Sequence, residues 1–301
     1  MISPKIEESR IQFGLRGCRE KDLPIYEPME LVKEAFDEFG DELAVSWSAG
    51  RCSTAVLHMA LQINPNVKVV FGDTTVLYPE DYAYRDLISG MWNLNPLITT
   101  KPIKPFWECI RQYGLPTIRR QYYHSYKRLR ETGRKRHTFQ EKTGKPACCW
   151  FCKDKPFLNA CKEFNIKASL VGLRVTESRA RMYYAADYGM KHYAKRYKIW
   201  KMNPILFWTT NQLERYFQEH NLPQNELYTK LGLSRNGCMP CTGFVNWEKQ
   251  LAELNPKMYR YIQKLRGVSL IDEFLSLEDE NFNQCDQGTT RTRQEFLEQW
   301  F

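Results

Sequence analysis

The feature of this sequence that most constrains its fold is an alternation of short apolar runs with helical stretches. Leu43–Trp47 and residues 67–71 each have the length and character of a buried strand. Residues 54–63 and 82–91, which follow them, have helical periodicity, and a later apolar run at 168–173 predicts another strand. Strands that alternate with helices form a mostly parallel sheet covered on both faces, so we expect a doubly wound α/β fold.

The rest of the chain suggests three parts. Residues 1–28 are polar and lack periodicity, which predicts an N-terminal arm. An amphipathic helix at 29–39 then opens an α/β domain that we expect to extend over residues 29–245. Residues 246–301 predict a mainly helical C-terminal extension with a polar tail.

Composition narrows the cellular setting. No run of apolar residues approaches the eighteen or so that a membrane-spanning helix needs, and the first residues carry no apolar signal core. We therefore expect a cytoplasmic protein without a membrane partner, whose ten cysteines act as thiols, metal ligands or catalytic groups before disulfides. Lys and Arg total 44 against 35 Asp and Glu, a net charge of +9 that suits phosphates or nucleic acid as partners.

The turn between the first strand and its helix, AVSWSAGRCSTAVL, has the properties of an anion cradle. The small residues Ser48, Ala49 and Gly50 allow backbone N–H groups to approach a phosphate, and the helix adds its positive N-terminus. No Gly-Lys-Ser/Thr closes the turn, so it is not a Walker loop. The expected side-chain donors are the hydroxyls of Ser46, Ser48, Ser53 and Thr54 and the guanidinium of Arg51.

Two cysteine knots, CCWFC at 148–152 and CMPC at 238–241, predict a thiolate metal site. A Cys-x-x-Cys turn places two sulfurs on one side of a loop, and two such turns close a tetrahedral site. The spacing alone leaves zinc and an iron–sulfur cluster open, and it does not decide whether Cys148 or Cys152 completes the set. The candidate ligands are Cys148, Cys149, Cys152, Cys238 and Cys241.

These motifs together resemble a known family. SWSAGRCS is similar to the PP-loop, S-x-G-G-K-D-S, of the adenine-nucleotide alpha-hydrolase superfamily. The motifs that follow occur in the order seen in its phosphoadenylyl-sulfate (PAPS) reductase family, and the resemblance covers roughly residues 28–245. They are FGDTTVLYPEDY at 71–82, GLRVTESRAR at 172–181, NPILFWTTNQLERYFQEHNLP at 203–223 and GCMPCT at 237–242.

The resemblance implies a nucleotide-binding domain for ATP, adenylyl sulfate (APS) or PAPS. Its phosphate would lie over loop residues 48–54, where Arg51 and Lys153 would offset developing negative charge. The adenosine would lie at the carboxyl ends of the strands. The residues implied there are Asp73, Thr74 and Gly172, with Arg174, Arg179 and Arg181 as phosphate or substrate contacts.

The resemblance also favours iron over zinc. A Cys-Cys pair, about ninety residues and then Cys-x-x-Cys is similar to the cluster signature of APS reductases, where a basic residue such as Lys153 accompanies the cluster. It implies a [4Fe–4S] cluster on Cys148, Cys149, Cys238 and Cys241. Cys149-x-x-Cys152 remains an alternative chelating pair.

The sequence departs from the family at three places. Arg51-Cys52 replaces the Lys-Asp of members that hydrolyse ATP. Sulfonucleotide reductases end in Glu-Cys-Gly-Leu/Ile-His, whereas this tail has only Cys285, with no histidine after it. GFVNWEKQLAELNP replaces the Arg-rich segment that follows Cys-x-x-Cys. Cys285 and Cys52 are therefore both candidate nucleophiles, and a helix N-terminus beside Arg51 would favour the thiolate of Cys52.

Basic and aromatic residues gather at 119–145 and 179–201, a composition typical of nucleic-acid grooves. Our first hypothesis is accordingly an iron–sulfur enzyme that binds an adenine nucleotide and transfers sulfur, onto tRNA or DNA, with a sulfur-donor or reductant protein. The second is a divergent APS or PAPS reductase that releases sulfite. The third is a nucleotide-binding accessory subunit without catalysis.

Overall fold

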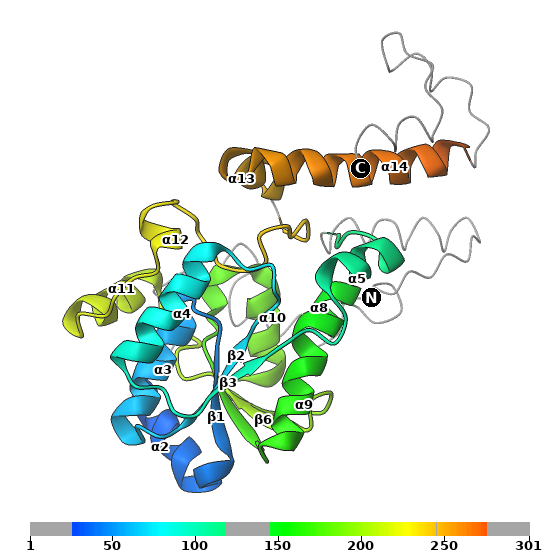
Figure 1. Cartoon of the computed structure of the whole chain (residues 1–301). Helices are drawn as coiled ribbons and strands as arrows, with labels where there is room; N and C mark the ends of the chain where they lie inside the picture. Colours follow the sequence, from blue (N-terminus) through cyan, green and yellow to red (C-terminus); the bar gives the residue numbers. More distant parts are fainter. Residues whose placement is uncertain (1–25, 118–144, 245, 276–301) are drawn as a thin grey trace. The chain divides into compact units, whose positions relative to one another are not determined.

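The computed structural model describes residues 26–117, 145–244 and 246–275 (Figure 1). The chain divides into two compact units, residues 1–247 and 248–301, which we describe separately. The expected boundaries at residues 28 and 245 remain predictions.

A six-stranded sheet in the order β3-β2-β1-β4-β6-β5 forms the centre of the first unit. Every neighbouring pair is parallel except β5 and β6, so the doubly wound, mostly parallel sheet is confirmed. The hairpin formed by β5 and β6 lies almost wholly within the basic segment 179–201, where the sequence analysis predicted no strand. The strands are β1 Leu43–Trp47, β2 Lys68–Gly72, β3 Leu97–Thr100, β4 Ala168–Val171, β5 Lys191–Ala194 and β6 Ile199–Met202.

Helices cover both faces of this sheet, with α2, α3 and α4 on one face and α9 on the other (Figure 1). The helices of the first unit are α2 Pro28–Phe39, α3 Arg51–Ile63, α4 Pro79–Met91, α5 Phe106–Tyr113, α8 Ala147–Cys149, α9 Lys155–Glu163, α10 Arg179–Tyr188, α11 Thr210–Glu219 and α12 Glu226–Thr229. Short turns of 3-10 helix occur at Gly40–Glu42 and Val175–Glu177, and a π-helical turn occurs at Trp150–Asp154.

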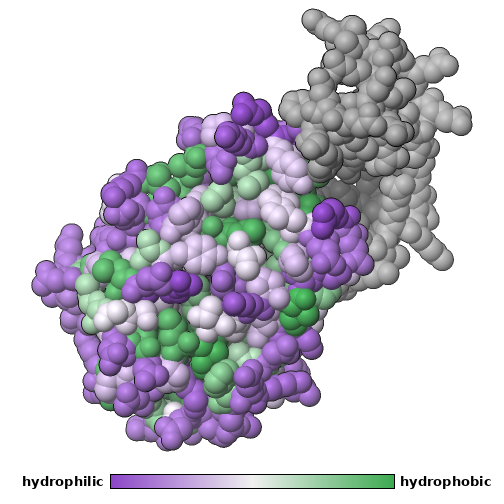
Figure 2. Space-filling model, in the orientation of Figure 1, coloured by the Kyte–Doolittle hydropathy of each residue, from purple (hydrophilic) through white to green (hydrophobic). Residues whose placement is uncertain are grey.

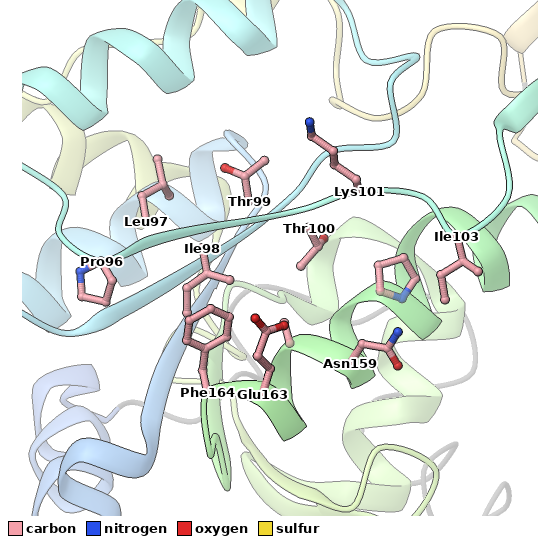
Figure 3. Close-up of a pocket in the computed structure, with 12 residues that line it drawn as sticks. Pro96, Leu97, Ile98, Thr99, Thr100, Lys101, Ile103, Asn159, Glu163 and Phe164 are labelled. Carbon is pink, nitrogen blue, oxygen red and sulfur yellow. The ribbon is translucent and has the colours of Figure 1, made fainter.

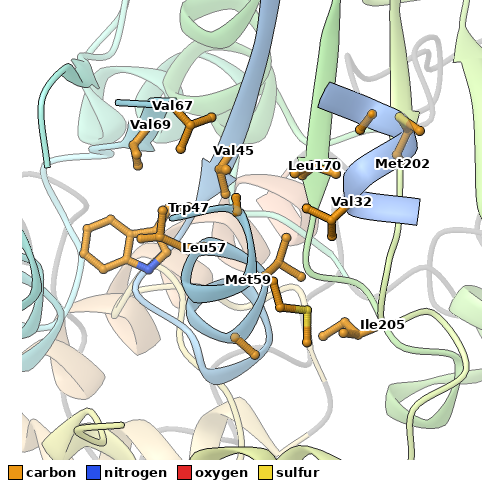
Figure 4. Close-up of a cluster of buried hydrophobic side chains, with 14 of the residues drawn as sticks. Val32, Val45, Trp47, Leu57, Met59, Val67, Val69, Leu170, Met202 and Ile205 are labelled. Carbon is orange, nitrogen blue, oxygen red and sulfur yellow. The ribbon is translucent and has the colours of Figure 1, made fainter. Parts of the chain in front are cut away.

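The core lies on the two faces of β1. Val45 and Trp47 pack on the α3 side with Leu57, and Figure 4 shows this cluster between the sheet and the helices. Ala44 faces the other way, toward Ala160 of α9. Burial on both faces explains why β1 has no polar alternation, since a central parallel strand meets apolar neighbours on each side.

Two helices begin earlier than expected, and one of them shapes the site. Helix α3 begins at Arg51 rather than at residue 54, with Gly50 as its N-cap in an extended conformation. Helix α4 begins at Pro79, where the missing N–H of a proline has no cost. The free N–H groups of α3 therefore lie directly beside the small-residue turn.

The described part of the second unit, up to residue 275, is helical, as predicted. Helix α13 (Trp247–Leu254) leads into α14 (Pro256–Leu275), and Arg266 pairs with Glu248 at 2.5 Å. Among the helices that the structure describes, none has the length and apolarity needed to cross a membrane.

Figure 2 shows one face of the first unit, on which hydrophilic and hydrophobic residues are interspersed.

Candidate functional site

The loop between β1 and α3 is braced by its own hydroxyls. The Ser53 hydroxyl accepts the Ser48 N–H at 3.2 Å and donates to the Gly50 carbonyl at 3.0 Å. The Ser46 hydroxyl bonds that of Ser169 at 2.7 Å, and Thr54 accepts the indole N–H of Trp47 at 3.0 Å. The Ser48 hydroxyl also bonds that of Ser53 at 3.1 Å. All four hydroxyls expected to contact phosphate thus already have protein partners that rigidify the turn.

Two asparagines hold the carbonyls of this loop from distant segments. The Asn225 amide donates to the Ala49 carbonyl at 3.2 Å and to the buried Asp81 carboxylate at 2.8 Å. The Asn236 amide donates to the Ser48 carbonyl. Sequence reasoning missed all three side chains, because nothing in their local sequence marks them as partners of a loop so far away along the chain.

A thiol with two charged partners lies at the first turn of α3. The Cys52 sulfur accepts the Nε–H of Arg174 at 3.2 Å and donates to Glu177 Oε1 at 3.0 Å. Glu177 also forms an ion pair with Arg181, and Arg174 bonds Thr210 at 3.3 Å. The structure thus brings together Cys52, Arg174 and Arg181 from the expected set and adds Glu177, which the sequence analysis did not identify.

Positive charge is concentrated around this thiol. Burial, together with the nearby cations Arg235 and Arg174, lowers the pKa of Arg181. The proximity of Cys52 acts in the other direction and raises it. Such a cluster of guanidinium groups favours an anionic ligand. Arg51, in contrast, turns toward Glu214 at 3.7 Å and lies over the ring of Tyr228 at 4.5 Å. The side chain of Arg179 and all of Cys285 lie outside the described residues.

The end of β4 touches the loop directly. A Cβ on Gly172 would overlap the backbone of Cys52 and Ser53, so only glycine permits this contact. At the end of β2, Asp73 accepts the Thr75 N–H and the Tyr82 hydroxyl, each at 2.7 Å. The neighbouring Thr74 is buried and accepts the Cys238 thiol at 3.3 Å, which joins this strand end to the second cysteine knot.

The five cysteines of the two knots, Cys152 included, influence one another's pKa. A hydrogen bond with Cys149, burial and the proximity of Cys238 and Cys241 raise the pKa of Cys148 well above its usual range. The same hydrogen bond, assisted by Lys153, lowers the pKa of Cys149 to about 7. Lys153 is partly buried, and the sulfurs of Cys238, Cys149 and Cys241 raise its pKa. The positive charge of Lys153 therefore stabilises the thiolate form of the cysteines beside it.

Cys152 faces a different neighbour. Its thiol donates to the Lys104 carbonyl at 3.5 Å, as does that of Cys109 at 3.8 Å. Burial, followed by the proximity of Cys109, raises the pKa of Cys152 to about 12. In the part of the chain that the structure describes, no three His, Cys, Asp or Glu side chains converge on a point where one metal ion would be held.

The basic segment 179–201 is partly neutralised by its own surroundings. Lys191 pairs with Glu34 and Glu38, and Lys201 lies over the ring of Tyr197 at 4.0 Å. Exposed cations remain on the turn of the β5–β6 hairpin, next to the exposed Tyr193; they are Lys195, Arg196 and Lys198. The other basic segment, 119–145, lies outside the described residues except for Lys145, which pairs with Asp154 at 2.5 Å.

A groove of about 450 Å³ runs along the outer edge of β3 beside α9 (Figure 3). Leu97, Ile98 and Phe164 line it together with Lys101 and Glu163. It contains no residue of the loop, the arginine cluster or the cysteine knots. The groove is therefore separate from the loop and the cysteine knots.

Comparison with known proteins agrees with this geometry. Residues 42–244 match the profile of the phosphoadenosine phosphosulfate reductase domain. The chain is 26% identical to an adenosine 5'-phosphosulfate reductase of Salinibacter ruber, over 71% of this chain and 73% of that protein. It is also 26% identical to a phosphoadenosine 5'-phosphosulfate reductase of Photobacterium profundum, over 75% and 79% of the two chains.

A solved structure shares the fold. The phosphoadenylyl-sulfate reductase of Candida auris, in a phosphate complex, aligns with a TM-score of 0.50 at 20% identity, covering 79% of this chain and 96% of the other. The resemblance seen in the motifs is thus confirmed over the whole α/β unit. This chain belongs to the phosphoadenosine phosphosulfate reductase family.

Proposed function

We propose that this protein is a sulfonucleotide reductase that releases sulfite from APS or PAPS with Cys52 as its nucleophile. The observation that carries the proposal is the hydrogen-bonded arrangement of Cys52 with Arg174 and Glu177 at the N-terminus of α3. A nucleophile within reach of a base that is itself oriented by a third group is the usual geometry of covalent catalysis. Here Glu177 is the base and Arg181 orients it.

The substrate's two anionic groups fit the charge of this region. Backbone N–H groups of the loop and of α3 would bind the phosphate, and Arg174, Arg181 and Lys153 would offset the charge of the transferring sulfonate. The adenosine would rest at the carboxyl ends of β2 and β4, near Thr74 and Gly172. Arg51 would contribute positive charge from the edge of the phosphate site, because its side chain already pairs with Glu214 and lies over the ring of Tyr228.

The chemistry requires one nucleophilic displacement and one reduction. Glu177 takes the thiol proton, and the Cys52 thiolate attacks the sulfate sulfur while the bond from that sulfur to the bridging oxygen breaks. The nucleotide leaves with the electron pair as AMP, or as its 3'-phosphorylated form from PAPS, and Cys52 carries an S-sulfo group. A dithiol reductant then attacks the Cys52 sulfur and releases sulfite. Its second thiol closes a disulfide, and Cys52 returns to a thiol.

We propose further that Cys148, Cys149, Cys238 and Cys241 hold a [4Fe–4S] cluster. The support for this set over one with Cys152 is the hydrogen bond of the Cys152 thiol to the Lys104 carbonyl. The proximity of Lys153 to Cys149, Cys238 and Cys241 supports a site for thiolate charge. A four-iron cluster takes each thiolate on a different iron, so its ligands stand further apart than around one zinc ion. The cluster would add a compact charge beside the substrate's sulfonate.

The test is an anaerobic assay of sulfite release from APS and from PAPS, with thioredoxin or dithiothreitol as reductant. We expect turnover with at least one of the two nucleotides and its loss in Cys52→Ser. Cys161→Ser is the matched control, because that buried thiol lies in the α9 core far from the loop. Turnover that survives Cys52→Ser but disappears in Cys285→Ser would assign the nucleophile to the C-terminal tail. Tight nucleotide binding without turnover under either reductant would favour the accessory-subunit hypothesis instead.

The exposed cations and tyrosine of the β5–β6 hairpin favour a second candidate, sulfur modification of tRNA or DNA. Such a surface binds a phosphate backbone with affinity that falls steeply with salt. Binding of single-stranded and duplex nucleic acid by the purified protein, measured between 50 and 200 mM salt, tests it. Loss of that binding on replacing Arg196 and Lys198 by Ala would support it, and absence of binding at 50 mM salt would exclude it.

A further inference from the structure

We infer that Asn225 and Asn236 are positioning residues that hold the loop 48–50 in its anion-binding conformation before any ligand arrives. The inference rests on the proposed function, because it takes this loop as the phosphate site. It adds a role for two side chains that do not belong to the loop but bind its carbonyls.

The geometry of the peptide unit carries the argument. In a trans peptide the C=O of one residue and the N–H of the next point in opposite directions. Asn236 binds the Ser48 carbonyl, which directs the Ala49 N–H away from Asn236, and Asn225 binds the Ala49 carbonyl, which does the same for the Gly50 N–H. Two successive N–H groups freed in this way form a concave anion site.

This arrangement requires a backbone conformation at Ala49 that is unfavourable for alanine. Ala49 has φ of 57°, in the left-handed region, and its side chain is fully buried. A residue with a Cβ is disfavoured there by roughly 5- to 30-fold relative to its ordinary conformations. The asparagine bonds offset this preference. Without them we expect the loop to relax, and the two N–H groups would then turn out of the site.

Asn225 is itself held in place, and Asn236 approaches the loop closely. Asn225 is buried and uses both amide hydrogens, on Ala49 and Asp81, while its oxygen accepts the Leu227 N–H at 2.9 Å. Its amide therefore cannot flip without losing all three partners. Asn236 approaches closely because residue 50 is glycine, where a Cβ would lie 2.8 Å from the Asn236 oxygen.

The experiment measures the affinity of the full-length protein for inorganic phosphate by calorimetry. The variants are Asn236→Ala and Asn225→Ala, each made alone and in the Ala49→Gly background, with the exposed Asn66→Ala as the matched control. Glycine enters the left-handed region freely, so it removes the need for the two bonds. Urea unfolding of each variant checks that the fold persists.

We expect Asn236→Ala to weaken phosphate binding by roughly 5- to 30-fold, and to weaken it much less in the Ala49→Gly background. Equal losses in the two backgrounds would overturn the inference, because they would show a role unrelated to the left-handed residue. Unchanged affinity in both folded asparagine variants, or wild-type protein that binds no phosphate, would overturn it as well. The four variants can give the expected phosphate affinities while the wild-type protein turns over neither APS nor PAPS. That result would refute the proposed reductase activity and leave the positioning role of the asparagines supported.

Discussion

Gly172→Ala is the substitution whose effect follows most directly from the structure. The new Cβ would lie 2.6 Å from the Cys52 carbonyl oxygen and closer still to two further backbone atoms of Cys52 and Ser53. These atoms belong to the first turn of α3 and cannot rotate away as a side chain would. Either β4 or the N-terminus of α3 must therefore move.

Overpacking of this kind costs about 1–3 kcal/mol, and a rigid backbone neighbour places this case at the upper end. A loss of about 3 kcal/mol would lower the midpoint of thermal unfolding by roughly 6–12 °C in a domain of this size. Because the displaced turn carries the anion site and Cys52, phosphate affinity and sulfite release should fall together with stability.

The assay is thermal and urea unfolding, followed by phosphate calorimetry on the folded variant. Gly90→Ala is the matched control, because Gly90 is exposed within α4 and a Cβ there meets nothing within 4 Å. Alanine at such a helical position should stabilise by about 0.5–1 kcal/mol. If Gly172→Ala unfolds like the wild type and binds phosphate equally well, the close packing of β4 on the loop is refuted.

Three further predictions concern titration and metal content. Burial raises the pKa of Asp81 to about 6, so the stabilisation from its protonated form is full below about pH 4 and is lost as the pH rises to 6. In Asp81→Asn the free energy of urea unfolding should therefore depend less on pH across that window. Burial lowers the pKa of Lys201 to about 8, so stability should rise with pH above 8, and Lys201→Met should stabilise the protein at pH 7 and abolish that rise. Iron content after anaerobic purification should fall sharply in Cys148→Ser and persist in Cys152→Ser, and the reverse pattern would assign Cys152 as the ligand.

The α/β core could be predicted from the sequence because β1 and β2 are mostly apolar and the helices that follow them are amphipathic. It did not reveal β5, whose residues Lys191–Ala194 carry no apolar alternation and are paired only through the β6 neighbour. The start of α3 was misplaced by three residues, since Arg51 and Cys52 give no helical signal until Gly50 is known to cap the helix.

The residues of the site were predictable where a local motif contains them, as with the loop, the cysteine knots and the segment that carries Arg174 and Arg181. The loop and the two cysteine knots are local patterns, and each could be recognised from spacing. Glu177 and Asn225 act through contacts with segments more than a hundred residues away, so their roles depend on the sheet order. Spacing left the choice between Cys148 and Cys152 open, and both thiols lie near enough to Cys238 for its charge to raise their pKa.

The central claim is that Cys52 is the thiol that accepts the sulfonate. Its most direct test is a single turnover with APS, and separately with PAPS, in the absence of reductant, followed by intact-mass and peptide mass spectrometry. We predict one added SO3 group per chain, located on the peptide that contains Cys52 and removed by dithiothreitol with release of sulfite. An SO3 group found on Cys285, or no adduct while sulfite is still formed on adding reductant, would contradict the claim.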